Sequence, residues 1–293
     1  MKTIRINFRH FWPGFTFASF KQRFPFLLRH WRFELSDRPD VLFYSCFPPN
    51  ARQAVVPKVD DACTRVFITH ENLRPDLATC DFAISFTRDI DSDRHLRLPN
   101  YVCRLFGLGI HPAALVKRND RIDVIRAAKT HFCVFVQSHD VAFRNDFVRR
   151  LARYRLVLCA GPCLNNTGTP LPAGWRPKLD LLQRYKFVVA FENESSPGYT
   201  TEKITDAMLV RSVPLYWGDP SVHLDFNPRS FVNFHELENV EEIIDRVVTL
   251  DRDDALYEEM LTQPYYAGDR VPPHCDPATI LPFFSKIFEA AGR

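Results

Sequence analysis

The stretch FENESSPGYTTEKITDAM, residues 191–208, sets polar and charged side chains in a row between two apolar strings. The string before it, KFVVAF, is typical of a buried strand. After it, apolar residues recur with helical spacing at Ile204, Ala207 and Met208. Thr200 or Thr201 could cap that helix. The stretch is therefore predicted to be a loop that ends where a helix begins.

Glu202 and Lys203 lie outside the apolar stripe and fall in the first turn of this helix. Exposed backbone N–H groups and the helix dipole favour an anion there, and Lys203 adds a mobile ammonium group. The pattern indicates a phosphate or pyrophosphate ligand, with Glu202 better suited to accept hydrogen bonds from sugar hydroxyls. The same residues also fit an ordinary capped surface helix with an acidic first turn.

A second pattern is VFITHENLRPD at 66–76, where a strand ends in a carboxylate, Glu71. A carboxylate at the carboxyl end of a strand can take a proton from a substrate. The alternative is a turn residue before Pro75.

A third pattern is FVQSHDVAFRNDF at 135–147, a strand, a polar turn and a helix start that carries Arg144. A guanidinium at this place could bind phosphate oxygens in fork geometry. The alternative is a solvated charge among the arginines that follow it.

Asp89, Asp91 and Asp93 form a DxD-type pattern that could hold a divalent cation. Arg88 and Arg94 flank it, so a self-neutralised loop is the favoured interpretation. The chain has no P-loop motif and no HExxH motif.

Buried-looking strands alternate with helical patterns, which predicts a parallel α/β architecture. The expected strands are 3–8, 41–46, 65–70, 82–86, 131–136, 155–160, 187–191 and 213–217. The expected helices are 20–31, 144–154, 178–185, 200–210, 239–250 and 280–291.

The charged segment 116–129 is the expected domain boundary. It separates residues 1–125 from 126–275, and residues 276–293 could cross back to the first half. Two α/β halves of this size would leave a cleft, and ligands bind at strand carboxyl ends of such sheets.

The composition is that of a folded protein, with 46% hydrophobic and 25% charged residues and a net charge of +3. No nucleic-acid partner is indicated, and no apolar run approaches the ~20 residues of a membrane span. The eight cysteines mostly lie in apolar strings, which indicates free thiols and a cytoplasmic location. The basic, aromatic segment 21–33 could touch the inner membrane of a bacterium, although a core-packed helix with a solvated basic side is favoured.

Three blocks, FENESSPGYTTEKITDA, VPLYWGDPSV and DFNPRSFVNFHE, run for about fifty residues without an evident gap. This region resembles the most diagnostic part of the bacterial α1,3/4-fucosyltransferases of glycosyltransferase family ten. Weaker similarity extends upstream through RVFITHENLRPD, DFAISF, FCVFV and FRNDF.

The resemblance implies a GT-B fold, in which two Rossmann-like domains face each other across a cleft. The N-terminal domain, 1–125, would bind the acceptor, and the C-terminal domain, 126–275, would bind GDP-fucose. It also implies that no cofactor is required: basic side chains would stabilise the leaving diphosphate, and a divalent metal could stimulate but would not be structural.

Residue roles follow from the resemblance by position. Glu71 looks like the general base, although His70 stands where a glycine more usually precedes it. The donor-binding residues that match family motifs are Arg144, Asn193, Tyr199, Glu202 and Lys203. Residues expected to contact the acceptor are His70 and the aromatics Trp12 and Phe15, which could stack on sugar faces or simply pack in the core.

The predicted reaction is single-displacement transfer of fucose from GDP-fucose, with inversion, to O3 of GlcNAc or Glc in an N-acetyllactosamine-like acceptor. Glu71 would remove the acceptor proton, and Glu202 could ease the positive charge on the sugar ring. The alternatives are a GT-B transferase for another nucleotide sugar and a non-catalytic glycan- or nucleotide-binding module.

Overall fold

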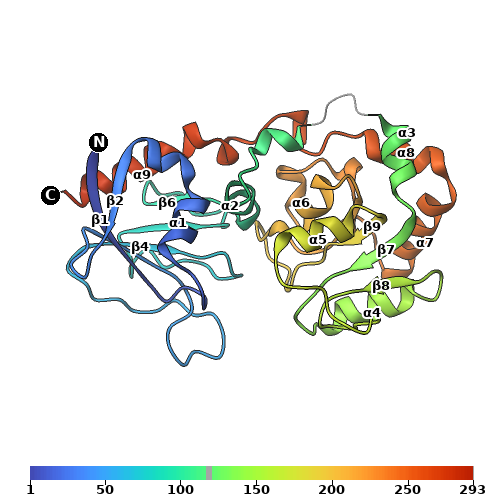
Figure 1. Cartoon of the computed structure of the whole chain (residues 1–293), viewed down its shortest axis with the longest axis horizontal. Helices are drawn as coiled ribbons and strands as arrows, with labels where there is room; N and C mark the ends of the chain where they lie inside the picture. The colour runs from blue at the N-terminus through green and yellow to red at the C-terminus, as the bar shows by residue number, and fades with distance from the viewer. Residues whose placement is uncertain (117–120, 293) are drawn as a thin grey trace. The chain divides into compact units, whose positions relative to one another are not determined.

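The computed structural model describes residues 1–116 and 121–292 (Figure 1). Its contacts divide the chain into two compact units. The first unit comprises Met1–Pro112 with Val271–Arg293, and the second comprises Ala113–Arg270. Each is a parallel β-sheet with helices packed on it, so the predicted α/β class is confirmed.

The first unit contains a six-stranded parallel sheet in the order β2-β1-β3-β4-β5-β6. Its central strands read as continuous apolar runs because both faces are covered, and all four residues of β3 are buried. The strands are β1 Lys2–Arg9, β2 Trp31–Leu35, β3 Val41–Tyr44, β4 Thr64–Ile68, β5 Phe82–Ser85 and β6 His95–Arg97. The helical segments are α1 Phe17–Arg23, η1 Pro25–Arg29, α2 Asn100–Gly107, η7 Pro273–Cys275 and α9 Pro277–Ala290, with η2 Pro112–Leu115 at the division between units.

The last helix, α9, packs on the first unit through its aromatic side chains, and Figure 1 shows it beside β2. The ring of Phe284 lies 5.2 Å from that of Phe24, and Phe288 lies 4.9 Å from Trp31. The chain after residue 270 therefore completes the core of the first unit.

The second unit contains a five-stranded parallel sheet in the order β11-β10-β9-β7-β8. Its strands are β7 His131–Phe135, β8 Val157–Cys159, β9 Tyr185–Val189, β10 Val213–Tyr216 and β11 Val232–Asn233. Its α-helices are α3 Ile122–Ala128, α4 Ala142–Leu151, α5 Trp175–Leu182, α6 Glu202–Leu209, α7 Val240–Arg252 and α8 Asp254–Thr262. Short 3₁₀ turns complete it: η3 Val222–Leu224, η4 Pro228–Ser230, η5 Phe234–Glu236 and η6 Ala267–Asp269.

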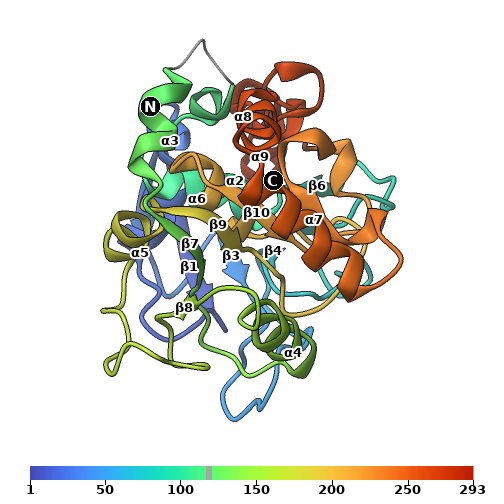
Figure 2. The ribbon, with the colours of Figure 1, turned by 90° about the vertical axis from the view of Figure 1, so that its right-hand side faces the viewer.

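Helices cover both faces of the second sheet. Figure 2 shows α5 and α6 on one face and α4 and α7 on the other. Alternate residues of one strand enter the two cores: Val188 packs with α5 and α6, whereas Phe187 and Val189 pack with α4 and α7. The sheet is therefore doubly wound.

The strand order of this sheet reverses next to β7. The chain leaves β7 toward β8 on one side and returns to β9 on the other. The loops that follow β7 and β9 therefore diverge at the carboxyl edge, which is where ligands bind in open α/β sheets.

The division between the units lies at Pro112–Ala113 and at Arg270–Val271, whereas the sequence placed the boundaries after 125 and 275. The difference arises because α3 packs on the second unit. Arg126 pairs with Asp254 at 2.5 Å and with Glu258 at 2.7 Å. Residues 117–120 of the expected boundary segment lie outside the described part of the chain.

The helix expected at 20–31 is wrong in its second half. Pro25 disfavours a helical Phe24, whose φ and ψ are −128° and 53°, so α1 ends at Arg23. Trp31 then begins β2, which pairs with β1. The aromatic side of this segment is core, because Phe20 and Phe24 are buried, together with Leu27.

Two other expectations concern charge and membranes. Cations distant in sequence neutralise two of the three aspartates of the DxD-type pattern: Arg74 pairs with Asp89, and Lys286 pairs with Asp93. Within residues 1–116 and 121–292, no helix is both long and apolar enough to cross a bilayer.

Candidate functional site

Helix α6 begins after the second of the two caps that the sequence offers. Thr201 occupies the N-cap with extended backbone (φ −101°, ψ −170°), and Glu202 and Lys203 form the first turn. The predicted apolar stripe is fully buried at Ile204, Ala207 and Met208. The hydroxyl of Thr201 makes no capping hydrogen bond and instead turns toward the end of β9.

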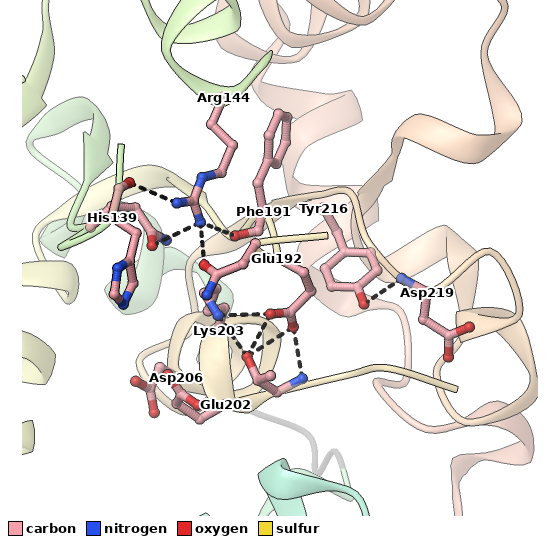
Figure 3. A network of polar contacts seen from close by, with 12 residues as sticks. His139, Arg144, Phe191, Glu192, Glu202, Lys203, Asp206, Tyr216 and Asp219 are labelled. Atoms are coloured by element: carbon pink, nitrogen blue, oxygen red, sulfur yellow. Dashed lines mark hydrogen bonds and ion pairs between the residues drawn. The ribbon is translucent and has the colours of Figure 1, made fainter. Parts of the chain in front are cut away.

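The group that receives Thr201 is Glu192, a fully buried carboxylate just after β9 (Figure 3). Oε1 of Glu192 accepts the backbone N–H of Thr201 at 2.7 Å, and the Thr201 hydroxyl lies 2.9 Å from Oε1 and 2.7 Å from Oε2. The Lys203 ammonium donates to Oε2 at 2.7 Å and to the Thr201 hydroxyl at 2.9 Å. The carboxylate thus fastens the N-terminus of α6 to the sheet.

Lys203 is held as a cation in this network. Burial lowers the pKa of Lys203, but the carboxylates of Glu192 and Glu202 more than offset burial and raise it overall. The ammonium group is therefore anchored rather than mobile, although the sequence suggested a mobile one.

Arg144, the third residue of α4, is wholly buried, which rules out a solvated charge. Its Nη1 donates to Asn193 Oδ1 at 2.8 Å and to Gln137 Oε1 at 3.1 Å, and its Nη2 donates to the carbonyl of His139 at 2.8 Å. Burial lowers the pKa of Arg144, but the guanidinium stays charged because the ordinary pKa of an arginine lies far above neutral pH. The loop after β7 and the loop after β9 thus meet at this guanidinium.

Asp219, which is fully buried, holds the loop that carries Tyr199. Asp219 accepts the backbone N–H of Gly198 at 2.7 Å and the hydroxyl of Thr200 at 3.1 Å. Tyr199 is 3% exposed, and its backbone N–H donates to the carbonyl of Ser196 at 3.1 Å. The residues after the predicted strand are therefore an ordered loop.

Gly218, which follows β10, permits the close approach of Glu192, which follows β9. A Cβ at position 218 would lie 2.4 Å from Cγ and 2.7 Å from Cβ of Glu192, and its φ of +156° is unfavourable for a side chain. The backbone N–H of Glu192 donates to the carbonyl of Trp217 at 2.8 Å, which holds the two segments together.

Figure 3 shows three of the predicted residues of the second unit, Arg144, Glu202 and Lys203, around one place. Arg144 contacts Asn193 directly, and Lys203 contacts Glu192, the residue that precedes Asn193 in the chain. Two cations, a helix N-terminus and the reversal of strand order coincide here, which makes the site suitable for a diphosphate.

The other predicted residues belong to the first unit, where Glu71 follows the carboxyl end of β4. Its backbone N–H donates to the hydroxyl of Thr69 at 3.2 Å, and the Thr69 hydroxyl donates to the thiol of Cys46 at 3.6 Å. Glu71 and His70 are both partly exposed. The loop after β4 therefore lies next to the loop after β3.

Trp12 and Phe15 lie in the loop after β1, in a cluster of half-buried rings. Phe11 stacks on Phe15 with centroids 4.0 Å apart, and Trp12 meets Phe15 edge-on at 4.9 Å. The Arg23 guanidinium lies 4.7 Å from the Trp12 ring. The rings pack on one another and still keep part of their surface exposed.

Sequence reasoning missed Glu192, Asp219, Gln137 and Gly218. Glu192 could have been suspected, because an acidic residue directly after an apolar strand run must be paired when it is buried. The sequence carries no local signal for Asp219 and Gly218, whose partners lie on another loop.

Within the described ranges, no three His, Cys, Asp or Glu side chains are grouped so that they could hold a metal ion. Metal-independent activity stays a prediction.

Two protein-family models match the chain. One describes the N-terminal domain of alpha-(1,3)-fucosyltransferase FucT and matches residues 6–104. The other describes the C-terminal part of glycosyltransferase family 10, fucosyltransferase, and matches residues 126–263, which include the whole network around Glu192. The chain belongs to glycosyltransferase family 10.

This family 10 chain is 34% identical over 227 residues to alpha-(1,3)-fucosyltransferase FucT of Helicobacter pylori. The alignment covers 67% of this chain and 46% of that protein, so the chain spans about half the length of this relative.

Crystal structures of an alpha1,3-fucosyltransferase resemble the family 10 chain across both units. The structure with GDP has a TM-score of 0.80 and 29% identity, covering 98% of this chain and 91% of that one. The structure with GDP-fucose has a TM-score of 0.77 and 28% identity, covering 99% and 91%. The expected GT-B-like α/β fold is confirmed by this likeness and by the two parallel sheets.

Proposed function

We propose that this chain transfers L-fucose from GDP-fucose to a hydroxyl group of an oligosaccharide acceptor. The observation that carries the proposal is the buried network that holds Arg144 and Lys203 at the carboxyl ends of β7 and β9. Two fixed cations beside a helix N-terminus are suited to a diphosphate. The similar crystal structures that contain GDP and GDP-fucose support GDP-fucose as the donor.

Arg144 can donate one further hydrogen bond to a ligand. Its Nε is buried and has no hydrogen-bond partner in the described part of the chain. A buried donor without a partner costs free energy, and a phosphate oxygen would satisfy it. Asn193, Tyr199 and Glu202 line the same network and would position the ribose or the fucose.

The reaction is a single displacement with inversion. The acceptor oxygen loses its proton to Glu71 and bonds to the anomeric carbon, while the bond from that carbon to the diphosphate breaks. The electron pair of that bond leaves with GDP, where Arg144, Lys203 and the N-terminus of α6 stabilise it. Each such donor group contributes on the order of 3 kcal/mol to transition-state stabilisation. Glu202 would ease the positive charge that develops on the sugar ring.

The acceptor site is proposed in the first unit, where the strand order reverses between β1 and β3. The loops after these strands touch, because Phe47 donates its N–H to the carbonyl of His10 at 2.8 Å. Glu71 follows β4, the next strand in the sheet. A sugar stacked on Trp12 and Phe15 would therefore lie within the same row of loops as the proposed base.

The acceptor is proposed to be an N-acetyllactosamine-like oligosaccharide that receives fucose on O3 of GlcNAc or Glc. His70 directly precedes Glu71 and is proposed to contact this acceptor. Half-exposed aromatic rings offer apolar faces for pyranose rings, and Glu71 offers the carboxylate that the hydroxyl needs.

A donor and acceptor screen tests this function. The purified chain is incubated with GDP-fucose, GDP-mannose or a UDP-sugar and a panel of oligosaccharides, and products are analysed by mass spectrometry with linkage determination. We expect product with GDP-fucose, carrying fucose on O3, and undiminished turnover in EDTA. Product from another donor alone would make the chain a different GT-B transferase, and binding of GDP without product from any acceptor would indicate a non-catalytic module.

A cytoplasmic location and a peripheral contact with the inner membrane stay predictions. Flotation with anionic liposomes tests the contact, which would involve the basic segment 21–33.

A further inference from the structure

Glu192 is the one acidic side chain in this site whose oxygens are both occupied by the N-terminal turn of α6, among the contacts that the structure describes. Its two oxygens receive the backbone N–H and hydroxyl of Thr201 and the ammonium of Lys203, at 2.7 to 2.9 Å. It is fully buried. A carboxylate so enclosed would repel a diphosphate if it faced one, so its role is exerted through its neighbours.

Glu192 is also held firmly from behind. Its backbone N–H is bound to the carbonyl of Trp217 at 2.8 Å, and its Cβ and Cγ fill the space that the absent side chain of Gly218 leaves. The carboxylate is therefore fixed in position and can hold the Lys203 ammonium in one place.

We propose that Glu192 is a positioning residue of the donor site, which fixes the Lys203 ammonium and the N-terminus of α6 in the geometry that receives the diphosphate of the nucleotide. This proposal rests on the proposed function for the identity of the ligand. It adds a residue that acts on the ligand only through Lys203 and the N-terminus of α6.

Charge explains why a carboxylate is required at this position. The charged groups that face Lys203 are Glu192 after β9, Glu202 on α6 and Arg144 on α4. Lys178 of α5 lines the same small cavity and pairs with Asp206 at 2.9 Å. Burial and Arg144 lower the pKa of Lys203, whereas Glu192 and Glu202 raise it. Without the charge of Glu192, the buried ammonium would lose its proton at a lower pH.

The test is the binding of GDP to Glu192→Gln, which keeps the shape and an acceptor for the backbone N–H of Thr201 but removes both the charge and the oxygen that accepts from Lys203. Calorimetry is done at pH 7.0 and pH 8.5, both above the second pKa of a phosphate, about 6, and both below the range in which the guanine N1–H of GDP loses its proton. We expect the wild-type dissociation constant to be nearly equal at the two values, because the pKa of Lys203 is raised. In Glu192→Gln, it should be up to about tenfold higher at pH 8.5 than at pH 7.0, as expected for one lost charge-assisted contact.

Two further variants identify the cause. Lys203→Met should bind GDP weakly and equally at both pH values, and adding Glu192→Gln to it should change the affinity little, because the two residues act as a unit. Glu192→Asp restores the charge and should restore the flat pH profile.

An equal loss of affinity at both pH values in Glu192→Gln would overturn the proposal, because it would indicate a merely structural role. If Glu192→Gln does not fold, Glu192→Asp decides: a pH-dependent affinity in that variant also overturns it. Failure of the wild type to bind GDP would instead contradict the proposed function.

Discussion

Arg144 and Asn193, 49 residues apart in sequence, meet where Nη1 of the guanidinium donates to Oδ1 of the amide at 2.8 Å. The contact joins the loop after β7 to the loop after β9 at the place where the sheet reverses its order. One planar group thus holds two diverging loops and faces the proposed diphosphate.

The variant Arg144→Lys should lose both functions of the guanidinium. A lysine keeps the charge but cannot reach Gln137, Asn193 and the carbonyl of His139 together. We expect GDP affinity, measured by calorimetry, to fall by roughly 10- to 100-fold, which corresponds to the loss of one or two charge-assisted hydrogen bonds. Arg149→Lys, on the exposed side of the same helix, is the control and should bind GDP as the wild type does. Equal affinity in the Arg144 variant would remove this residue from the donor site.

The variant Gly218→Ala should destabilise the second unit. Its Cβ would lie 2.4 Å from Cγ of Glu192, at a φ of +156°. Overpacking and backbone strain together are expected to cost roughly 2–4 kcal/mol of unfolding free energy, measured by urea denaturation. Gly14→Ala is a matched control, because Gly14 has φ +86° but open space around it. It should lose only about 1 kcal/mol, and a similar loss in both variants would show that the contact with Glu192 is unimportant.

The variant Glu71→Gln should strongly reduce transfer without weakening the binding of the donor. Removal of a general base typically reduces turnover by about 10²- to 10⁴-fold. GDP affinity, measured by calorimetry, should stay within about twofold of the wild type, because the donor network is built from residues of the second unit. Asp76→Asn, an exposed change in the same loop, should retain turnover. Wild-type turnover in Glu71→Gln would remove Glu71 from the mechanism.

Lys129 should make the stability of the chain depend on pH. Its Nζ donates to the carbonyls of Gln183 and Val210 at 2.9 and 2.6 Å, beside the ends of α5 and α6. Burial, with Arg211 nearby, lowers the pKa of Lys129 from 10.5 to about 7. Between these values the unfolded chain binds a proton that the folded chain does not, so stability rises with pH through this window.

The measurement for Lys129 is the free energy of unfolding at pH 7 and pH 9, compared with Lys129→Met. The wild type should gain on the order of 1 kcal/mol per pH unit relative to the variant. A constant difference between the two proteins would contradict the lowered pKa.

The strands of both sheets could largely be predicted, because runs such as VLFY at 41–44 are buried on both faces and carry their signal locally. Strands β2, β6 and β11 were missed. β2 has charged residues and follows a helical pattern, whereas β6 and β11 have only three and two residues. The helices α2, α3 and α8 were missed as well.

The candidate site was partly predictable for a similar reason. The N-terminus of α6 is encoded by adjacent residues, so Glu202 and Lys203 were placed correctly in its first turn. The burial of Arg144 and the partners of Glu192 depend on loops that only the fold brings together. No spacing rule along the chain could have shown that Lys203 is anchored to Glu192.

The return of Val271–Arg293 to the first unit bears on how the polypeptide acquires its structure during synthesis. The ribosome releases β1 to α2 long before it makes α9. The ring surfaces of Phe24 and Trp31, which later pack on Phe284 and Phe288, therefore stay exposed to solvent until α9 has been made. The second unit is contiguous in sequence and can mature first. A nascent chain stalled before residue 271 should therefore expose apolar aromatic surface to which chaperones bind.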